Sequence, residues 1–369
     1  PDFAAVDERH SELRASITYR LPAGVLGNRV GSDFARDQLQ RVFTYRHDTT
    51  SDELRLFVRF RNLPRLRVAV TGGRGFIGTA LTHLLTTQGH TVVPIDRAAR
   101  VETPSLPTRN PDDGVLNPET LDGIDAVVHL AGESVSEGRW NHAKKRRIRS
   151  SREQGTARLV TSLMELKQPP KVLVSASAIG FYGPRGDEIL DEQSDRGTGF
   201  LSEVAEAWES AAQVAAVAGI RVVNSRFGVV LSPTGGALAK MLPLFKVGAG
   251  GVLGSGRQGV SWISLDDAIA ALLHCLMSAD LEGPVNLTAP HPVDNRELTK
   301  VLARVLHRPA LARVPSLAAR VAFGEMAEEM LLTGSRVVPN KLLGNGFEFR
   351  QPDLETALRH LLGRTDETV

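Results

Sequence analysis

Residues 66–78 constrain the fold of this chain more than any other stretch. Leu66 to Val70 is a short apolar run rich in valine, typical of a buried strand, and glycines follow it at 72, 73, 75 and 78. After Gly75 the apolar residues take up helical spacing. A strand, a tight glycine turn and a helix in this order let the backbone approach a pyrophosphate, whose charge faces the unpaired N–H groups of the helix. The stretch therefore predicts a dinucleotide-binding fold.

The glycine loop contains the first candidate contacts to a cofactor. We favour Gly72, Gly75 and Gly78 as the working glycines, although Gly73, Gly75 and Gly78 fit the more common spacing. The predicted contacts in this loop are Gly72, Arg74, Gly75, Phe76, Ile77 and Gly78. A glycine triplet alone is weak evidence, because any tight turn can contain one. The alternative is a glycine turn that binds no ligand.

A second apolar run, Thr91–Ile95, strengthens the prediction. It ends at Asp96 and Arg97, where the adenosine ribose should lie. A carboxylate there accepts the 2′-hydroxyl of NAD, whereas a guanidinium binds the 2′-phosphate of NADP. Both groups are present, and Arg74 offers a second cation near that phosphate unless it is an exposed loop side chain. We therefore expect NADP as the cofactor, with NAD as the alternative.

An alternation of strands and helices places the loop in a larger fold. The expected strands are 66–71, 91–95, 124–131, 171–177 and 220–226, and the expected helices between them are 76–88, 139–166 and 200–217. This order predicts an α/β protein with a doubly wound parallel sheet over residues 66–230, because parallel strands need crossover helices. Residues 231–369 are predicted to form mainly a smaller α/β substrate or lid region, with 264–288 returning to the nucleotide-binding core.

The third expected strand ends in small residues beside the predicted crevice. Leu130, Ala131, Gly132 and Glu133 come at the end of that strand. Small side chains at the carboxyl end of a strand leave room for a cofactor. We therefore include these four residues in the predicted cofactor site, with a plain strand-to-loop turn as the alternative.

The composition is that of an ordinary globular protein. Of the 369 residues, 42% are hydrophobic and 23% are charged, and the formal net charge of +2 favours neither nucleic acid nor a membrane surface as a partner. The basic run at 144–147 is interpreted as a solvated helix face. The one cysteine, Cys275, forms no internal disulfide, which suits a reducing cytoplasm. We expect a small-molecule substrate, no metal site, no membrane span and, as one candidate assembly, a homodimer.

Residues 1–62 precede the nucleotide-binding unit. Ser16–Leu21 alternates like an edge strand, and Gly27–Val42 has the spacing of an amphipathic helix that a linker follows. The segment from Ile17 to His47 resembles the closing strand and long helix of a helix-grip, START-like domain, a fold often used for apolar ligands. We expect a partial α+β remnant of such a domain and assign it no function.

Several motifs together resemble the extended short-chain dehydrogenase/reductases. Besides the glycine loop, the similar stretches are 174–183, 253–258, 261–267, 324–327 and 347–354. The later ones are similar to the atypical branch of SulA-type nucleoside-diphosphate-sugar epimerases, including its C-terminal domain of unknown function, and the resemblance runs from about residue 66 to 363. It implies a Rossmann-like fold, NADP held through an arginine matching Arg97, and a nicotinamide contact at Phe227.

The wider superfamily uses a serine, a tyrosine and a lysine four residues after the tyrosine, and this sequence departs from that pattern. The lysine lowers the pKa of the phenol, so that the tyrosine passes a proton while hydride moves. Tyr182 is the only tyrosine in the nucleotide-binding region, and Gly186 stands four residues after it. Phe200 to Val204 fills the usual place of the pair. A phenol with an unperturbed pKa of about 10 is a poor base at neutral pH.

Three interpretations of the chemistry follow. Tyr182 works with Ser175 or Ser177 as a modified acid/base pair, or a carboxylate such as Glu133 or Glu203 replaces the phenol, or the protein binds a dinucleotide with little turnover. The first makes Tyr182, Ser175 and Ser177 our catalytic candidates. The structural alternatives are that Tyr182 closes the substrate pocket by packing and that the serines cap the strand end.

Glycine-rich loops after Phe227 are typical of a substrate lid. There Arg257 is a candidate clamp for a phosphate or carboxylate, and Trp262 is a candidate for stacking on a flat group. The structural alternatives are that Arg257 pairs with Asp266 or Asp267 and that Trp262 belongs to the core. The sequence predicts an NADP-dependent oxidoreductase or epimerase acting on a small polar substrate, for which a nucleotide-sugar is one candidate, or a non-catalytic NADP(H)-binding sensor or scaffold.

Overall fold

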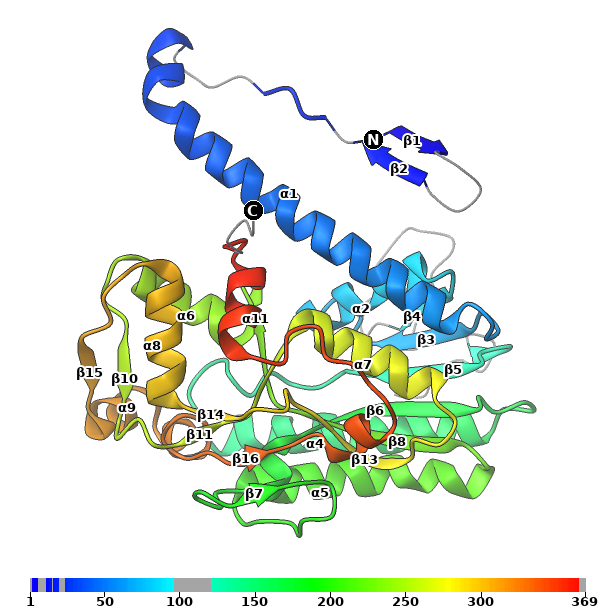
Figure 1. The fold of residues 1–369 in the computed structure, drawn as a ribbon. Coiled ribbons are helices and arrows are strands. Elements are labelled where there is room, and N and C mark those ends of the chain that lie inside the picture. The colour runs from blue at the N-terminus through cyan, green and yellow to red at the C-terminus, as the bar shows by residue number, and fades with distance from the viewer. Residues whose placement is uncertain (1, 6–10, 15, 20–23, 96–120, 365–369) are drawn as a thin grey trace.

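A six-stranded sheet lies at the centre of the molecule (Figure 1). The computed structural model describes residues 2–5, 11–14, 16–19, 24–95 and 121–364. The strands of the sheet are β3 (Arg67–Thr71), β4 (Thr91–Ile95), β5 (Ala126–His129), β6 (Val172–Ala178), β8 (Arg221–Phe227) and β13 (Gly283–Leu287). Their order is β13-β8-β6-β5-β3-β4, and every neighbouring pair is parallel. The predicted α/β class with a doubly wound parallel sheet is confirmed.

Helices cover both faces of this sheet. The two layers are α2 (Phe76–Thr87) and α7 (Leu265–Met277) on one face, and α4 (His142–Met164), α5 (Phe200–Gln213) and the 3-10 helix η2 (Val214–Ala218) on the other. Successive side chains of a strand point to opposite faces. Val68 and Val70 accordingly pack with α2 and α7, whereas Ala69 packs with α4 and η2. Burial on both faces explains why these strands are continuously apolar.

The strand order reverses at β3. The chain passes from β3 to β4 on one side, and β5, the next described strand, pairs with β3 on the other. Thr71, the last residue of β3, lies opposite His129, the last residue of β5. Open α/β sheets bind ligands at such a reversal, outside the carboxyl ends of the strands. The glycine loop begins directly after Thr71 and therefore lies at this point.

The remaining C-terminal elements form a lobe beside the carboxyl ends of the strands (Figure 1). Its helices are α6 (Gly236–Lys246), α8 (Asn295–Leu306), α9 (Ser316–Phe323), the π-helix η3 (Ala327–Leu332), α10 (Asn340–Gly344) and α11 (Leu354–Leu361). Three of its short strand pairs are β9 (Val229–Ser232) with β12 (Trp262–Ser264), β10 (Gly251–Leu253) with β15 (Ala312–Val314), and β11 (Gly259–Val260) with β14 (Val293–Asp294). In the fourth pair, β16 (Arg336–Val337) lies beside β7 (Ile189–Leu190), a strand that follows the 3-10 helix η1 (Ile179–Tyr182). Buried residues of α6, α8 and α11 share one core cluster.

The N-terminal segment contributes a long helix to the body of the protein. After the hairpin β1 (Asp2–Ala5) and β2 (Ser11–Arg14), helix α1 spans Gly24–Phe60, well beyond the predicted 27–42. Phe60 belongs to the core cluster of α2 and α7. The end of α1 thus packs on the nucleotide-binding unit, whereas the sequence placed residues 1–62 in a separate segment.

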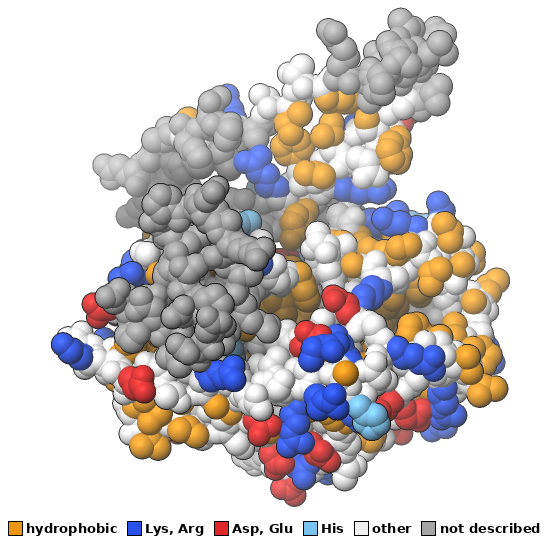
Figure 2. Space-filling model, turned by 180° about the vertical axis from the view of Figure 1, so that it is seen from behind, with side chains coloured by type: hydrophobic (Ala, Val, Ile, Leu, Met, Phe, Trp, Pro, Cys, Tyr) orange, Lys and Arg blue, Asp and Glu red, His pale blue; other side chains and the backbone are white. Residues whose placement is uncertain are grey.

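The residues before α1 differ from the predicted edge strand. Residues 16–19 form no strand, although the alternation predicted one. Figure 2 shows hydrophobic side chains on the part of the molecule that projects from the body. Phe34 and Val42 of α1 are exposed. Within the described ranges, no helix has the length and apolar character needed to cross a membrane.

Candidate functional site

The glycine loop has a backbone that only glycine fits at two of its three working positions. Gly72 has a φ of +70°, and a Cβ there would lie 2.9 Å from the backbone of Leu130 and Ala131. At Gly78 a Cβ would lie 2.3 Å from the Gly72 carbonyl oxygen. These contacts bring β3, β5 and α2 closer together than any other residue would allow.

Gly75, the third of these glycines, is exposed at the surface. It is the N-cap of α2, in extended conformation, and no side chain caps the helix there. A Cβ on Gly75 would approach only the Gly72 carbonyl oxygen, at 3.3 Å, and Gly75 is exposed. The first N–H groups of a helix have no partner within the helix, so the start of α2 presents donors and the positive end of its dipole at this place. The loop is therefore built to hold an anion at its open side.

The predicted contacts Arg74, Phe76 and Ile77 differ in what their side chains do. Arg74 is exposed, and Phe76 and Ile77 are partly buried against the α2–α7 core. The Phe76 ring packs against Gly235, where an added Cβ would lie 2.7 Å from it. Phe76 and Ile77 can therefore face a ligand only through their backbone N–H groups, whereas Arg74 can reach one with its side chain.

The end of β5 forms the second wall of the site. The backbone N–H groups of Leu130 and Ala131 bond to the carbonyl and hydroxyl oxygens of Thr71, at 3.1 and 3.3 Å. Beyond them, a Cβ on Gly132 would lie 3.2 Å from the guanidinium carbon of Arg152. Hydrogen bonds to Thr71 therefore hold the backbone of Leu130 and Ala131 close to the end of β3. We name the glycine loop and residues 130–133 together the glycine-loop site.

Glu133 is tied to helix α4 and does not fit the role of a general base. Its carboxylate accepts a hydrogen bond from Lys144 at 2.8 Å and one from Arg147 at 3.4 Å. The hydrogen bond from Lys144, with help from Arg147, lowers the pKa of Glu133 below its usual value. A carboxylate with a lowered pKa is a weak base. Glu203, the other carboxylate considered, is exposed on α5 and lies 4.0 Å from Arg149.

Tyr182, predicted as a catalytic residue, lies in the protein interior in this structure. Its side chain is fully buried, and its hydroxyl donates to Asn286 at 2.8 Å and accepts from Arg226 at 2.9 Å. Burial raises the pKa of Tyr182 to about 12, against the opposing effect of Arg226. The phenol is therefore neither ionisable near neutral pH nor accessible to a substrate. This position agrees with the structural alternative, in which Tyr182 packs in the interior.

The predicted serines belong to the same interior. Ser175 is completely buried and donates to the Ala176 carbonyl oxygen. Ser177 is 3% exposed and donates to the Glu209 carboxylate at 2.6 Å. Glu209 also receives two hydrogen bonds from Arg226, at 2.7 and 2.8 Å. The two serines do not line an open site in this structure, so the acid/base pair with Tyr182 is not assembled.

The buried polar network around Tyr182 comes from four elements. Arg226 of β8 bonds Tyr182 of η1 and Glu209 of α5, and Ser177 of β6 completes the network. The Arg226 guanidinium also lies 3.5 Å from the centroid of the Phe181 ring. Burial lowers the pKa of Arg226, but the hydrogen bonds and charge of Glu209 outweigh it and raise that pKa. We name Ser177, Tyr182, Glu209 and Arg226 the buried network.

Phe227 ends β8 next to this network. It pairs in register with Leu287, and the N–H of the following residue, Gly228, bonds to the Leu287 carbonyl oxygen. A Cβ on Gly228 would lie 2.6 Å from the Ser261 carbonyl oxygen. Phe227 is partly buried against the α7 core. It stands at the carboxyl edge of the sheet, where the resemblance places a nicotinamide contact.

The two substrate candidates lie in unlike places. Arg257 is exposed on the loop between β10 and β11. Trp262 is completely buried in the lobe core and donates its indole N–H to the His291 carbonyl oxygen at 3.1 Å. Trp262 therefore has no face open to a substrate in this structure, as the core alternative expects. A tryptophan in a run of strand residues that packs between helices is core.

The two aspartates after Trp262 have structural partners. Asp266 accepts from His360 at 2.8 Å, and Asp267 accepts from the backbone N–H groups of Arg350 and Gln351. Neither pairs with Arg257 in the described part of the chain. The aspartates instead fasten α7 to the C-terminal end of the protein.

The C-terminal lobe contacts the start of α4 and the start of α5. Lys145 of α4 pairs with Glu325 at 2.6 Å, and the Glu329 carboxylate accepts from the Phe200 backbone N–H at the start of α5 at 3.4 Å. Lys240 of α6 donates to the carbonyl and hydroxyl oxygens of Ser136, in the loop after Glu133. These contacts hold the lobe over the loop that continues from the glycine-loop site.

Comparison with known proteins now decides the family. Residues 68–312 match the NAD dependent epimerase/dehydratase family, and residues 314–361 match a domain of unknown function, DUF1731. The chain belongs to the NAD dependent epimerase/dehydratase family. An epimerase family protein of Mycobacterium tuberculosis is 43% identical over 297 residues, which are 80% of this chain and 98% of that protein.

Two solved structures extend the comparison for this epimerase/dehydratase family member. Human epimerase family protein SDR39U1, solved with NADPH, is 33% identical, with a TM-score of 0.73 over 80% of this chain and 99% of that one. A nucleoside-diphosphate sugar epimerase from Corynebacterium glutamicum is 36% identical, with a TM-score of 0.72 over 88% of this chain and 65% of that one. The predicted C-terminal domain of unknown function is also confirmed.

Sequence reasoning missed two side chains that shape the site of this family member. Arg152 is partly buried, lies 4.8 Å from the Trp208 ring centroid and donates to the Glu133 carbonyl oxygen at 2.9 Å. Glu209 holds Arg226. Each is a charged residue beside buried positions of its helix, which was the available signal, but a sequence pattern does not show which residue it contacts. Asp96 and Arg97, the predicted ribose contacts, lie outside the described residues.

Proposed function

We propose that this epimerase family protein binds NADP(H) at the glycine-loop site and uses it for oxidoreductase or epimerase chemistry on a small polar substrate. The observation that carries the proposal is the backbone of the loop. Gly72 and Gly78 bring the strand ends and α2 together, and the uncapped start of α2 opens beside the exposed Gly75. This is the arrangement that a pyrophosphate needs.

The residues present fit such a cofactor. Gly75 is exposed at the N-cap of α2 and carries no side chain that could cover the start of the helix. The backbone from Gly72 to Gly78 would hold the pyrophosphate, and Leu130 to Gly132 would border the adenosine half. When bound, a nicotinamide dinucleotide supplies a hydride acceptor or donor. The protein's own residues bind it, orient it and cover it.

The choice of NADP over NAD rests on cations. Arg74 is exposed within the loop, and Arg97 follows the second strand in the sequence. A guanidinium binds a 2′-phosphate through two parallel hydrogen bonds, and the free 2′-hydroxyl of NAD cannot form this charged contact. NADPH in the human relative supports this choice.

A nucleoside-diphosphate sugar is the substrate class that the relatives favour. The Corynebacterium glutamicum structure carries that description at 36% identity. In this chain the exposed Arg257 is the side chain we assign to a substrate phosphate. A phosphate bound there would be held mainly by charge, so its affinity should fall with salt.

A non-catalytic NADP(H)-binding sensor or scaffold is the second candidate function. It is favoured by one observation, the burial of Tyr182 with both of its hydrogen bonds made inside the protein. Hydride transfer to a carbonyl needs a proton donor within hydrogen-bond reach of the reacting oxygen. Tyr182, Ser175 and Ser177 do not meet this requirement as they stand.

Cofactor binding is tested by titrating NADPH and NADH into the purified protein while nicotinamide fluorescence and the melting temperature are recorded. NADPH at about 100 times its Kd should stabilise the fold by about 2.7 kcal/mol. NADPH should bind at least about tenfold more tightly than NADH, because a paired phosphate contact is worth more than 1 kcal/mol.

The matched variants are Arg74→Gln and Arg158→Gln. Both arginines are exposed, but Arg158 lies on α4, away from the loop. Arg74→Gln should weaken NADPH while leaving NADH unchanged, and Arg158→Gln should change neither. If neither dinucleotide alters fluorescence or melting temperature, the proposal fails.

Turnover separates the two candidate functions. The protein is loaded with NADPH deuterated at the transferable C4 position and incubated with nucleoside-diphosphate sugars and simple carbonyl compounds. Deuterium that appears in a product identifies an oxidoreductase. In a second arm the protein is loaded with NADP+, because an epimerase must first take a hydride from the sugar and then return it. Interconversion of two sugar epimers by this protein, with its cofactor retained, identifies an epimerase. Binding without either result leaves the sensor or scaffold.

A further inference from the structure

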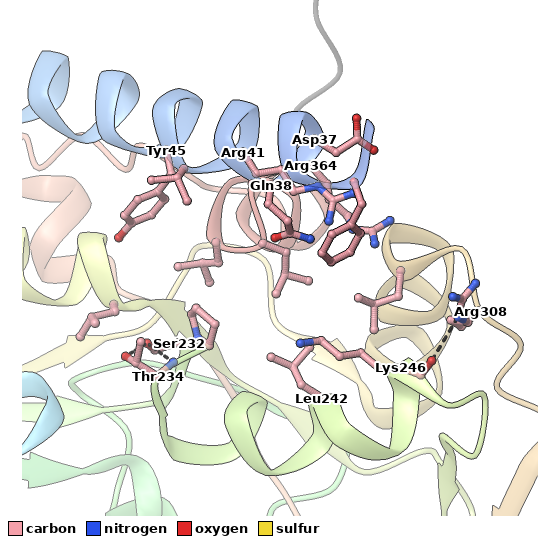
Figure 3. Close-up of a pocket in the computed structure, with 18 residues that line it drawn as sticks. Asp37, Gln38, Arg41, Tyr45, Ser232, Thr234, Leu242, Lys246, Arg308 and Arg364 are labelled. Carbon is pink, nitrogen blue, oxygen red and sulfur yellow. Dashed lines mark hydrogen bonds between the residues drawn. The ribbon is translucent and has the colours of Figure 1, made fainter. Parts of the chain in front are cut away.

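A pocket lies beneath helix α1 (Figure 3). Its volume is about 800 Å³. Its walls come from α1, the loop after β9, α6 and the ends of α8 and α11. The volume lies within the range of about 300–1,000 Å³ that small-molecule sites occupy.

One part of this α1 pocket is apolar. Leu242 of α6, Leu306 of α8 and Leu361 of α11 line it from the lobe side. From the opposite side, Phe34 and Val42 of α1 line it with 70% and 59% of their surface exposed. Large apolar side chains that stay exposed inside a concave surface gain free energy when a ligand covers them.

The other part of the α1 pocket is cationic. Four of its lining residues are Arg41, Lys246, Arg308 and Arg364, which come from α1, α6 and the ends of α8 and α11 (Figure 3). Arg308 donates to the Lys246 carbonyl oxygen and Arg364 to the Val305 carbonyl oxygen. Among the residues that the structure describes, none of the four cations forms an ion pair with a carboxylate.

The acidic counterpart within the pocket is smaller than its positive charge. Among the described residues that line the pocket, Asp37 is the one carboxylate, against four cations. Burial lowers the pKa of Arg364, and the like charges of Arg41 and Arg308 lower it further. Like charges held close together without counter-charges favour an anion between them.

We propose that the α1 pocket binds an anionic amphiphile, with a carboxylate head held by the cations and an aliphatic chain against the leucines and Phe34. Each half of the pocket requires one half of such a ligand. A free inorganic anion leaves the apolar side chains uncovered, and a neutral hydrocarbon leaves the cations unpaired. A second copy of the same surface brings cations against cations, so self-association through this pocket is disfavoured.

The ligand also has a structural consequence for α1. The C-terminal half of α1 is fastened by Phe60 in the core and by the hydrogen bond from Gln88 to the Glu53 carbonyl oxygen. The part near Phe34 projects away from the body (Figure 1). An amphiphile that contacts α1 and α11 at once joins the projecting part to the lobe, so its binding should raise the melting temperature.

The test uses the full chain and dansyl-undecanoate, a fluorescent carboxylate amphiphile, below its micelle concentration. We expect saturable one-to-one binding that raises dansyl emission, and at least about tenfold weaker binding of the matched methyl ester. Inorganic phosphate at millimolar concentration should not displace the probe. Higher salt should weaken the carboxylate probe and leave the ester unchanged, because salt screens exposed charges.

Three variants locate the site. Arg41→Glu and Arg364→Glu should each weaken dansyl-undecanoate by about tenfold or more, because each replaces an attraction with a repulsion. Arg36→Glu is the control, since Arg36 lies on the same helix, is exposed and lines no part of the pocket. Leu242→Gln should weaken the carboxylate and the ester alike, because it acts on the chain rather than the head.

Several results would overturn the proposal. Equal affinity for the carboxylate and the ester would show that the cations take no part. Displacement by phosphate alone would reduce the pocket to an inorganic anion site. Displacement by NADPH would place the probe in the glycine-loop site, and unchanged binding in both charge-reversal variants, with circular dichroism showing that they are folded, would place it elsewhere.

Discussion

The glycine-loop site and the buried network stand at the ends of neighbouring strands, and sequence motifs predicted chemistry at both. At the first, backbone contacts at Gly72 and Gly78 leave an open helix start. At the second, Arg226 and Glu209 close around Tyr182 and leave no exposed functional group. The glycine-loop site is open because its glycines have no side chains, whereas the side chains of the buried network fill the space around them.

This difference teaches which motifs can be transferred to a new chain. A glycine loop works through backbone geometry, which the glycines themselves impose. A catalytic tyrosine works only with partners that lower its pKa, and those partners come from other elements. Here the partners are Arg226 and Asn286, and burial raises the pKa of Tyr182 instead. The motif around Tyr182 could therefore be recognised from the sequence, but the environment of its phenol could not.

The largest effect should come from breaking the buried network. Glu209→Gln leaves the Arg226 guanidinium, whose side chain is 4% exposed, without its counter-charge. Loss of one partner of a buried pair costs about 3–5 kcal/mol. We expect the free energy of unfolding in urea to fall by this amount while the NADPH affinity of the folded fraction stays unchanged. A variant as stable as the parent would show that the network is not structural.

The next effect should come from filling the glycine loop. Gly78→Ala places a Cβ 2.3 Å from the Gly72 carbonyl oxygen, and overpacking of this kind costs up to about 3 kcal/mol. The backbone must shift, so NADPH binding should be lost even where the variant folds. Gly155→Ala is the control, because nothing lies near its added Cβ in α4. This helix substitution should stabilise the protein by about 0.5–1 kcal/mol.

A smaller effect is expected from Tyr182→Phe. The variant removes one donor and one acceptor and leaves Asn286 and Arg226 each short of a partner. We expect a loss of about 1–2 kcal/mol in unfolding free energy. Any turnover per folded molecule should be unchanged. A loss of turnover by orders of magnitude at an unchanged melting temperature would restore Tyr182 as a catalytic residue and erase the contrast between the two regions.

The smallest effect concerns His360 of α11, which lies 3.7 Å from Asp48 of α1 and 2.8 Å from Asp266 of α7. Burial lowers the pKa of His360, but its hydrogen bond to Asp266 and the charges of Asp266, Asp48 and Asp52 outweigh this and raise it. Because the folded pKa is raised, the stabilisation is complete below the unfolded value of about 6.5 and is lost as the pH rises through the folded pKa. Tyr45 also bonds Asp266 and titrates far above this range.

Melting temperature measured against pH checks this prediction. His360→Gln should remove the part of the pH slope above about 6.5 and cost about 1 kcal/mol at low pH, the size of one net hydrogen bond. His291→Gln, at an exposed histidine, should leave the slope as it is. If both variants keep the parent's slope, His360 does not hold α1 by its charge.

The structure decided the matters that depend on distant residues. The end of α1 joins the nucleotide-binding core through Phe60, which no local pattern indicates. The α1 pocket gathers Arg41, Lys246 and Arg364 from elements far apart in the chain. Trp262 and Tyr182 are buried because other elements of the fold pack on them. The residue type alone does not show whether an aromatic side chain contacts a ligand or the core.

The sequence by itself determined the parallel sheet and the glycine loop. Continuous apolar strands need cover on both faces, and glycines between a strand and a helix impose their own backbone path. These are local constraints, so a local pattern is enough to read them. Burial, charge pairing and pKa depend on side chains that meet only after folding. For that reason, tertiary structure alone decided which polar groups of this protein face a ligand and which hold the fold together.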